Sequence, residues 1–210
     1  KWRGKAFGSE RCLIAFRLAL DWAERVGLRY VEHCAYVRPS IPGRFGPRWR
    51  SGWEPVHLFQ RVGAPGFFDP KGFTLKALEP DRVQRKARFR AADRTRHVYS
   101  GPQYKTGETK MLTTAFSTLP GRKKADQVGH PAIFAQDFAD AYVRCYSPPD
   151  GLVCDPFVGS GTTAIAAASS GRRFIGGDLG CHEDGRQWAG IALERALASR
   201  PTGATAQGCP

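Results

Sequence analysis

Near its start the chain has a stretch in which apolar residues recur every three or four positions. Within residues 10–26, Leu13, Phe16 and Leu20 fall on one face of a helix, and this spacing predicts an amphipathic helix. Gly27 follows the last turn. Glycine is a common residue just past a helix end, because it takes a positive φ without steric cost. We therefore expect one helix that stops at Gly27.

The next two segments alternate apolar and polar residues, which is the period of a β-strand. Residues 28–37 alternate in this way and end before Pro39, so they predict a strand that the proline stops. Residues 38–52 are too rich in Pro, Gly and Arg for regular structure and predict a loop. Residues 53–62 predict a second strand, and Pro55 confines its early part to a sheet edge or a bulge.

Regular structure is expected again only late in the chain, because residues 63–129 show no long apolar period. The later segments switch between helical and strand periods, which predicts alternating helices and strands. The predicted elements are an amphipathic helix at 135–147, a short buried strand at 151–155, a helix of small residues at 162–171, a second strand at 172–178 and a last helix at 183–199. Residues 200–210 have the composition of a disordered tail.

A loop with two glycines precedes the small-residue helix. The order over residues 151–178 is strand, glycine loop, helix, strand and acidic residue, which is one βαβ unit of a mainly parallel sheet. Gly159 and Gly161 lack a Cβ, so a ligand can lie against the backbone at the helix start. Asp178 ends the second strand, where a carboxylate accepts hydrogen bonds from the ribose hydroxyls of an adenosine.

Several ligands are compatible with such a loop, and the residues around the glycines distinguish them. A triphosphate loop requires a Lys before its Ser or Thr, and this loop lacks one. A dinucleotide loop of the form G-x-G-x-x-A is satisfied by Gly159, Gly161 and Ala164. However, Asp155 at the strand end repels a pyrophosphate and attracts an ammonium group, and Phe157 offers an apolar ring. These residues favour S-adenosylmethionine, with a tight turn that binds nothing as a further alternative.

Together with an upstream segment, the loop resembles a known enzyme family. The sequence HPAIF at 130–134, followed after a helix by DPFVGSGTT and then IGGD, is similar to the DNA amino-methyltransferases that modify adenine N6 or cytosine N4. It resembles the subgroup, often called β, in which the cofactor motif comes last. The family usually has Glu where Asp178 stands and Ala where Val158 stands. The resemblance implies S-adenosylmethionine as cofactor, with contacts from His130, Pro131, Phe134, Asp155, Phe157, Gly159, Ser160, Gly161, Thr162 and Asp178.

The same resemblance implies an α/β, Rossmann-like S-adenosylmethionine-dependent methyltransferase fold, incomplete in this chain, with an irregular basic target-recognition insert. By this resemblance, residues 1–62 form part of the catalytic domain, residues 63–128 the target-recognition region and residues 129–199 the cofactor-binding part. The implied reaction transfers a methyl group from S-adenosylmethionine to an exocyclic amine of a base that has been flipped out of the duplex.

The charge of the chain indicates a partner. The formal net charge of the 210 residues is +13, which suits a polyanion such as double-stranded DNA. Residues 82–96 contain seven Lys or Arg and one Asp, with Phe89 among them. The stretch is either a solvated basic surface or a DNA-facing segment, and the aromatic residue favours DNA. The predicted DNA contacts are Arg82, Arg85, Lys86, Arg88, Arg90, Arg94 and Arg96.

The family's catalytic tetrapeptide, an Asp, Asn or Ser followed by Pro-Pro and an aromatic residue, has one imperfect counterpart. Ser147, Pro148, Pro149 and Asp150 contain the two prolines but lack the aromatic residue and follow a helix, so they predict a turn. No other Pro-Pro pair occurs in the sequence. We therefore expect the C-terminal part of a methyltransferase that has no catalytic residues of its own and leaves a sheet edge unpaired.

Three functions are compatible with these observations. The first is a methyltransferase fragment whose missing N-terminal segment carries the catalytic loop. The second is a non-catalytic subunit of a split methyltransferase, which binds DNA and cofactor and is completed by a partner subunit. The third is an NAD-dependent dehydrogenase, which the glycine spacing permits.

Composition excludes several other classes. Apolar residues make up 41% of the chain, which is ordinary for a globular protein. None of the six cysteines forms a C-x-x-C pair and the five histidines lack metal-binding spacing, so we expect free thiols and no metal site. The sequence has no apolar run of membrane length. We expect a cytoplasmic, nucleoid-associated protein of a prokaryote or phage.

Overall fold

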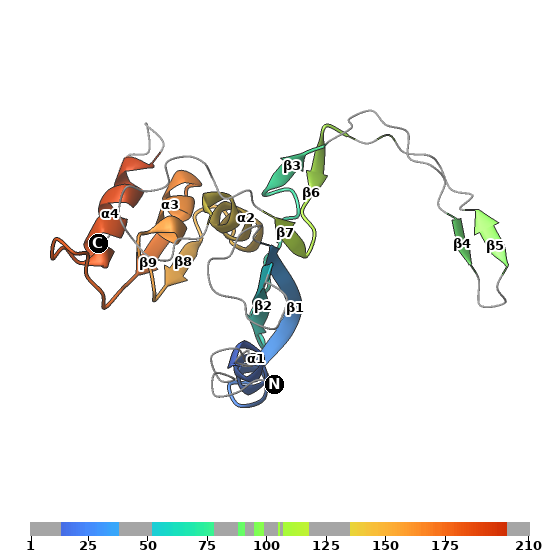
Figure 1. Ribbon diagram of the computed structural model, residues 1–210, viewed down its shortest axis with the longest axis horizontal. Helices are drawn as coiled ribbons and strands as arrows, with labels where there is room; N and C mark the ends of the chain where they lie inside the picture. Colours follow the sequence, from blue (N-terminus) through green and yellow to red (C-terminus); the bar gives the residue numbers. More distant parts are fainter. Residues whose placement is uncertain are drawn as a thin grey trace, which may run out of the picture.

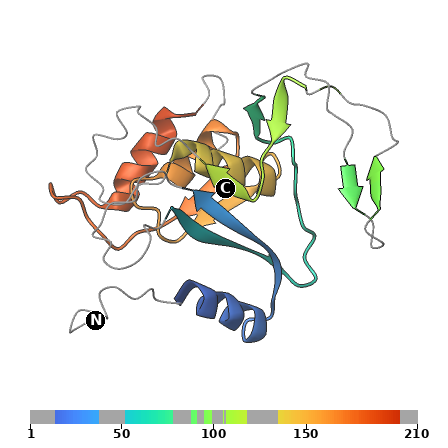
Figure 2. The same ribbon diagram turned by 45° about the vertical axis from the view of Figure 1, so that its right-hand side comes forward.

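The computed structural model of the chain has two packed α/β parts and an extended arm (Figure 1). The residues that the structure describes are 14–37, 52–77, 88–90, 95–98, 105, 107–117 and 135–200. Figure 2 turns the molecule and shows the same arrangement, with the arm still directed away from the two parts.

The C-terminal part is a parallel βαβ unit. Strand β8 (Leu152–Asp155) pairs in parallel with β9 (Arg173–Gly176), and helix α3 (Thr162–Ser169) connects them. Helices α2 (Gln136–Tyr146) and α4 (Trp188–Ala198) both contact α3, and Figure 1 shows the three helices side by side. Every helix and strand predicted for this part is confirmed, with somewhat shorter bounds.

Small residues let these helices approach one another closely. Ala166 and Ala167 of α3 are 0% exposed and pack with Ala139 and Val143 of α2. The opposite side of α3 presents Ala164, which is buried against α4. A larger side chain at such a position would force the helices apart, because protein interiors have little free volume. The run of small residues in the sequence is therefore a packing requirement of α3.

The prediction of a buried strand at 151–155 is correct for the strand and wrong for its burial. Val153 packs against the cluster that α2 and α3 form, but Leu152 is 57% exposed and Cys154 is exposed. Ile175 of β9 is also 57% exposed. Within the described residues β8 pairs with β9 alone, and the helices cover one face of the pair. Because parallel sheets are normally covered on both faces, the apolar sequence of β8 fits a surface that these residues do not bury.

The two prolines between α2 and β8 form a turn. The N–H of Gly151 donates to the carbonyl of Pro148 at 3.0 Å, which is the hydrogen bond of a β-turn. Asp150 takes a φ of +59°, a conformation that Asp tolerates better than most residues. Ser147 follows the last turn of α2 and its N–H donates to the Val143 carbonyl at 3.1 Å. The prediction that this tetrapeptide is a turn is confirmed.

The N-terminal part is a helix and a three-stranded sheet. Helix α1 (Ile14–Glu24) leads through Gly27, at a φ of +72°, into β1 (Leu28–Val37). Strand β1 pairs antiparallel with β2 (Trp53–Arg61) and parallel with β7 (Ala115–Ser117), which gives the order β2-β1-β7. The predicted helix and both predicted strands are confirmed. Strand β7 ties the end of the predicted recognition region to this sheet.

Helix α2 joins the two parts. Its Ala141 is 1% exposed and packs with Tyr36 of β1 and Phe116 of β7, while its other side contacts α3. The ring centroids of Phe138 and Tyr36 are 4.4 Å apart. The hydroxyl of Tyr36 also accepts a hydrogen bond of 3.2 Å from the N–H of Ala135, at the start of α2. Both parts therefore depend on one helix.

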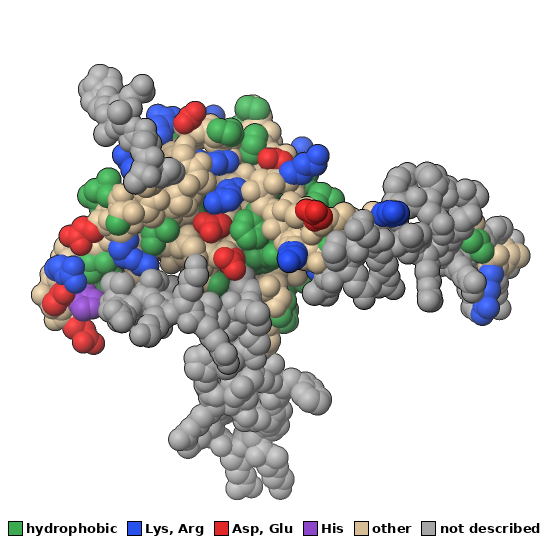
Figure 3. Space-filling view, turned by 90° about the horizontal axis from the view of Figure 1, so that it is seen from above, with side chains coloured by type: hydrophobic (Ala, Val, Ile, Leu, Met, Phe, Trp, Pro, Cys, Tyr) green, Lys and Arg blue, Asp and Glu red, His purple; other side chains and the backbone are tan. Residues whose placement is uncertain are grey.

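The arm consists of two short antiparallel pairs. Strand β3 (Thr74–Lys76) pairs with β6 (Thr109–Met111), and β4 (Arg88–Arg90) pairs with β5 (Arg96–Val98). Figure 1 shows the β4-β5 pair at the far end of the arm, and Figure 3 shows Lys and Arg side chains along the arm's described parts. The sequence pattern predicts none of these strands, because three residues are too few to display a period.

The last helix begins later than predicted. Helix α4 starts at Trp188, whereas the sequence pattern predicts a start at 183. Residues 181–187 instead form a closed loop in which Cys181 bridges Gln187 and Gly185 takes a φ of +85°. An Asp-Gly pair favours a turn over a helix, which explains the delay. Of the predicted tail at 200–210, residues 201–210 lie outside the described residues.

Candidate functional site

The loop between β8 and α3 turns on two glycines. Gly159 and Gly161 have φ values of +47° and +91°. A Cβ on Gly161 would lie 2.7 Å from the Cα of Ala192 in α4, so the position excludes a side chain both by conformation and by space. Ser160 and Thr162 are 4% and 5% exposed. The loop that follows β8 therefore packs closely against α4.

Asp178 fixes this loop from the end of β9. One oxygen of its carboxylate, Oδ2, accepts a hydrogen bond of 2.8 Å from the N–H of Gly159, and Oδ1 accepts one of 2.8 Å from the N–H of Gly180. The N–H of Val158 donates to the Gly177 carbonyl at 2.9 Å alongside. A carboxylate has about four acceptor positions, so two remain for hydroxyl donors of a ligand. Asp178 thus positions the loop and can still bind a ligand.

Asp155 and Phe157 lie at the other side of the same loop. Asp155 ends β8, and its Oδ1 accepts a hydrogen bond of 3.0 Å from the N–H of Phe157. Phe157 is 85% exposed, so its ring is accessible for packing against a ligand. A carboxylate and an apolar ring therefore stand together at the mouth of the loop.

The start of α3 is also held by two side chains from the neighbouring helices α2 and α4. Gln136 of α2 donates from Nε2 to the Thr162 carbonyl at 3.3 Å, and Arg195 of α4 donates from Nη1 to the Ser160 carbonyl. No side chain caps the first turn of α3, so its N–H groups present partial positive charge to the loop side. The sequence does not indicate the contacts of Gln136 and Arg195, because both residues lie far along the chain from the loop residues that they bind.

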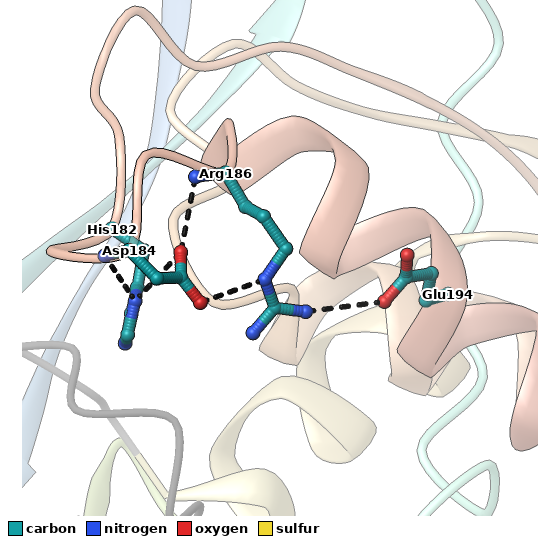
Figure 4. A network of polar contacts seen from close by, with 4 residues as sticks. All are labelled: His182, Asp184, Arg186 and Glu194. Atoms are coloured by element: carbon teal, nitrogen blue, oxygen red, sulfur yellow. Dashed lines mark hydrogen bonds and ion pairs between the residues drawn. The ribbon is translucent and has the colours of Figure 1, made fainter.

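A polar network closes the loop that follows Asp178 (Figure 4). Asp184 accepts from the Arg186 backbone N–H at 3.0 Å and from its Nε at 2.8 Å, and it lies 3.0 Å from Nδ1 of His182. These hydrogen bonds lower the pKa of the Asp184 carboxyl to about 2. Arg186 also reaches Glu194 of α4 at 3.6 Å. The network sets the path of the chain from the glycine loop to α4.

The structure brings together most of the predicted cofactor residues. Asp155, Phe157, Gly159, Ser160, Gly161, Thr162 and Asp178 all line or hold the loop. His130, Pro131 and Phe134 lie outside the described residues. Of the predicted DNA contacts, Arg88 and Arg90 lie in β4, Arg96 is exposed in β5, and Arg82, Arg85, Lys86 and Arg94 lie outside the described residues.

A separate hollow lies elsewhere in the described residues. It has a volume of about 900 Å³ and lies between α2 and strands β1 and β2, with Leu58, Phe59 and Phe73 in its wall. Burial raises the pKa of Cys34 and Tyr142, which also line it. An apolar hollow of this kind, without charged groups that converge on a ligand, does not have the character of the glycine-loop site.

In the described residues, no group of three or more His, Cys, Asp or Glu side chains is placed to bind a metal ion. None of their helices combines the length and apolar character that crossing a membrane requires.

Several methyltransferases have similar sequences over part of their length. The type II methyltransferase M1.MboII of Moraxella bovis is 50% identical over 44 residues, which is 21% of this chain and 17% of that protein. The orphan methyltransferase M.BamHII of Bacillus amyloliquefaciens is 39% identical over 66 residues, 31% of this chain and 23% of that protein. The type II methyltransferase M.ScaI of Streptomyces caespitosus is 38% identical over 55 residues, 26% and 18% respectively. These three matches each cover less than a quarter of the relative.

Two solved structures share the fold. The PvuII DNA methyltransferase, described as cytosine-N4-specific, superposes with a TM-score of 0.57 at 17% identity over 91% of this chain and 65% of that chain. M1.HpyAVI, solved as a complex with SAM, gives 0.53 at 18% identity over 87% and 69%. The predicted Rossmann-like methyltransferase fold is confirmed by this likeness. The profile of the N6/N4 DNA methylase family matches residues 15–183. Because this match spans most of the sequence, the chain belongs to the DNA methylase family.

Proposed function

We propose that the chain is the cofactor-binding and DNA-recognition part of a DNA methyltransferase that uses S-adenosylmethionine to methylate adenine N6 or cytosine N4. The observation that carries the proposal is the glycine loop at the start of α3, held by Asp178 through Gly159 in a chain of the DNA methylase family. Membership of this family favours S-adenosylmethionine over NAD for the same loop.

The residues present suit this cofactor. S-adenosylmethionine supplies a methyl group on a sulfonium centre, between an adenosine and an amino-acid end. Asp178 has acceptor positions left for ribose hydroxyls beyond the backbone bonds it makes. Asp155 at the end of β8 supplies negative charge for a cationic ligand, and a pyrophosphate would be repelled there. Phe157, which is 85% exposed, offers a ring against which such a ligand can pack.

We propose that the catalytic part of this function is supplied from outside the 210 residues. Methylation of an exocyclic amine needs acceptors that orient the NH2 group and an aromatic ring that stacks on the flipped base. Ser147 and Asp150 flank the only Pro-Pro pair, and they form a turn. We therefore propose that a missing N-terminal segment or a partner subunit supplies the catalytic tetrapeptide, and that double-stranded DNA is the substrate.

Open edges of the described residues support this part of the proposal. Strands β8 and β2 are each hydrogen-bonded to a neighbour along one side only. Leu152 and Ile175 leave an apolar face beside β8 uncovered. The chain spans 65% and 69% of the two methyltransferase structures that share its fold. Additional strands and a helix from elsewhere would cover these surfaces.

Calorimetric titration of the chain with S-adenosylmethionine, and separately with NAD, tests the cofactor. We expect saturable binding of S-adenosylmethionine. Asp178→Ala removes a hydrogen-bonded charge and should weaken binding by about 1–3 kcal/mol. Asp184→Ala is the matched control, because Asp184 also accepts backbone and side-chain hydrogen bonds but lies in the following loop. The affinity of this variant for S-adenosylmethionine should stay within about twofold of that of the unchanged chain. Saturable NAD binding without S-adenosylmethionine binding would overturn the proposal.

The origin of the catalytic tetrapeptide has a separate test. A tetrapeptide of the family type, encoded in the same reading frame upstream of Lys1, would assign the chain to a longer methyltransferase. A start codon beside Lys1 and a neighbouring gene with the tetrapeptide would assign it to a split enzyme. Methyl transfer to DNA by the 210-residue chain alone would contradict both.

A further inference from the structure

The carbonyl group of Ser160 lies in the middle of the glycine loop. Ser160 belongs to neither β8 nor α3 and is 4% exposed. A backbone carbonyl that is buried without a hydrogen bond costs free energy, because it has given up its bonds to water. Arg195, 35 positions later in α4, donates to this carbonyl from Nη1. A charged donor makes a stronger bond than a neutral one, so a side chain of α4 satisfies the buried carbonyl of the loop.

The peptide group between Ser160 and Gly161 is held at both of its polar ends. Its carbonyl accepts from Arg195, and its N–H, that of Gly161, donates to the Val158 carbonyl at 2.8 Å. A peptide group is planar, with its C=O and N–H directed to opposite sides, so these two bonds together set its orientation. Gly161 has a φ of +91°, and glycine has the widest range of backbone conformations. The bond from Arg195 therefore restrains the loop at a residue whose backbone turns easily.

Two other side chains restrain the same loop from different elements. Gln136 of α2 donates from Nε2 to the Thr162 carbonyl at 3.3 Å, and Asp178 after β9 accepts from the N–H of Gly159 at 2.8 Å. Helices α2 and α4 both contact α3 and lie beside it in Figure 1. The loop is thus fixed from three sides. Arg195 is the charged donor among these restraints, so its loss should release the loop more than the loss of the neutral Gln136.

We propose that Arg195 is a positioning residue of the cofactor site, which holds the Ser160 carbonyl so that the loop is ordered before S-adenosylmethionine binds. The inference rests on the proposed function for its ligand, and it adds a residue of α4 that acts through the loop without touching the cofactor. When only a fraction of the molecules has the ordered loop, the apparent affinity falls in proportion to that fraction. Removal of the Arg195 donor should therefore slow association and leave dissociation unchanged.

A purely structural role for the same side chain predicts a different result. Arg195 lies in the last turn of α4, where a cation stabilises the negative end of the helix dipole. In that role its loss would lower the free energy of unfolding of the chain, but the rate of cofactor association would stay the same. The kinetics of binding and the order of the loop in the free chain therefore distinguish the two roles.

Surface plasmon resonance with S-adenosylmethionine on the immobilised 210-residue chain measures both rate constants. Arg195→Met keeps an aliphatic side chain but removes the donors, so the association rate constant should fall about tenfold and the dissociation rate constant should stay within about twofold. Arg195→Lys restores a donor and should recover association to within about threefold of the unchanged chain. Association as fast in Arg195→Met as in the unchanged chain would overturn the proposal. So would a change confined to dissociation, or an Arg195→Lys variant as slow as Arg195→Met.

Arg172→Met is the matched control for a general loss of stability. Arg172 also donates to backbone carbonyls, those of Ser170 at 2.6 Å and Ser147 at 3.0 Å. It precedes β9, whereas Asp178 follows the other end of that strand. Arg172→Met should lower the free energy of unfolding, measured by urea, and leave the association rate constant within about twofold. An equal slowing of association in Arg172→Met and Arg195→Met would assign the effect to stability and refute the positioning role.

Amide hydrogen exchange of the free chain, followed by NMR, tests the order of the loop without any cofactor. The amides of Gly159 and Gly161 are hydrogen-bonded, and Arg195→Met should raise their exchange rates about tenfold, with no such change in Arg172→Met. Unchanged exchange and unchanged association in an Arg195→Met chain that binds S-adenosylmethionine would refute this inference alone. Faster loop exchange in Arg195→Met, combined with an unchanged chain that does not bind S-adenosylmethionine, would support the role of Arg195 in the loop and refute only the proposed function.

Discussion

The βαβ unit and the β2-β1-β7 sheet both pack on α2, but they are assembled from different kinds of chain segments. The unit uses consecutive elements from α2 to α4, and its strands, helix and glycine loop follow one another in sequence. The sheet takes β1 and β2 from the N-terminal part and β7 from beyond the arm. Its buried residues, such as Tyr36 and Phe116, reach their partners on α2 only after a long chain separation.

This difference indicates which substitutions should disturb each part. The unit is fixed by backbone contacts at close range, such as Gly161 against Ala192, so a single added atom disturbs it. The sheet is fixed by side chains on one helix, so it depends on α2 and tolerates change at its open edge. Contacts that are local in sequence also form with a smaller loss of chain entropy. The candidate cofactor site thus lies in the part whose contacts are the more local in sequence.

The largest expected effect concerns the glycine loop. Gly161→Ala combines a φ of +91° with a Cβ 2.7 Å from the backbone of α4, and should lower the free energy of unfolding by about 3 kcal/mol. Gly171→Ala is the matched control, because it has a φ of +74° but nothing within 4 Å, and should lower it by about 1 kcal/mol. Urea unfolding followed by circular dichroism measures both. Equal losses would mean that α4 moves aside freely.

Thiol reactivity compares the covered and uncovered surfaces of the two parts. Cys154 is exposed on β8, whereas Cys34 of β1 is buried, and burial raises the pKa of the Cys34 thiol. Alkylation of Cys154 should be about 100-fold faster, because only the accessible thiolate reacts. Peptide mass spectrometry after timed labelling gives both rates, with the exposed Cys181 as the reference. Protection of Cys154 but not Cys181 by a completing segment would locate that segment beside β8.

The contact between the sheet and α2 should have a moderate effect. Tyr36→Phe removes the hydroxyl that accepts the N–H of Ala135 and should lower the free energy of unfolding by about 1 kcal/mol. Tyr30→Phe is the control, since its exposed hydroxyl lies 3.3 Å from Nδ1 of His57, and the loss should stay below about 0.5 kcal/mol. A loss for Tyr36→Phe no larger than for the control would show that the bond at the start of α2 contributes nothing.

The smallest effect is a dependence on pH in the sheet. Burial, and then the charge of neighbouring His33, lower the pKa of His57. The unfolded chain therefore takes up this proton at a higher pH than the folded protein, and stability falls as the pH drops below about 6.5. Thermal unfolding at pH 7.5 and 5.5 measures the loss. His57→Phe should reduce it, and an unchanged pH dependence in that variant would assign the loss to other groups.

The sequence predicts the C-terminal unit well, because its periods, glycines and acidic strand end are local signals. Asp178 was expected at the loop and is found there, although its bonds to Gly159 and Gly180 give it a structural task that no pattern indicates. The exposure of Leu152 could not be predicted, since an apolar strand has the same sequence whether or not its neighbours are present. The sequence pattern indicates neither the strands of the arm nor the contact of Arg195 with the loop. Both depend on pairing between residues that are distant along the chain.

The hydrogen bonds that Asp178 accepts from backbone N–H groups bear on the kinetics of cofactor binding. Gly159 and Gly180 are already tied to its carboxylate, so binding need not order the loop at either glycine. A preorganised site loses little conformational entropy on association. We therefore expect an association rate constant that is insensitive to solvent conditions that slow loop closure, and differences in affinity among Asp178 variants to appear mainly in the dissociation rate.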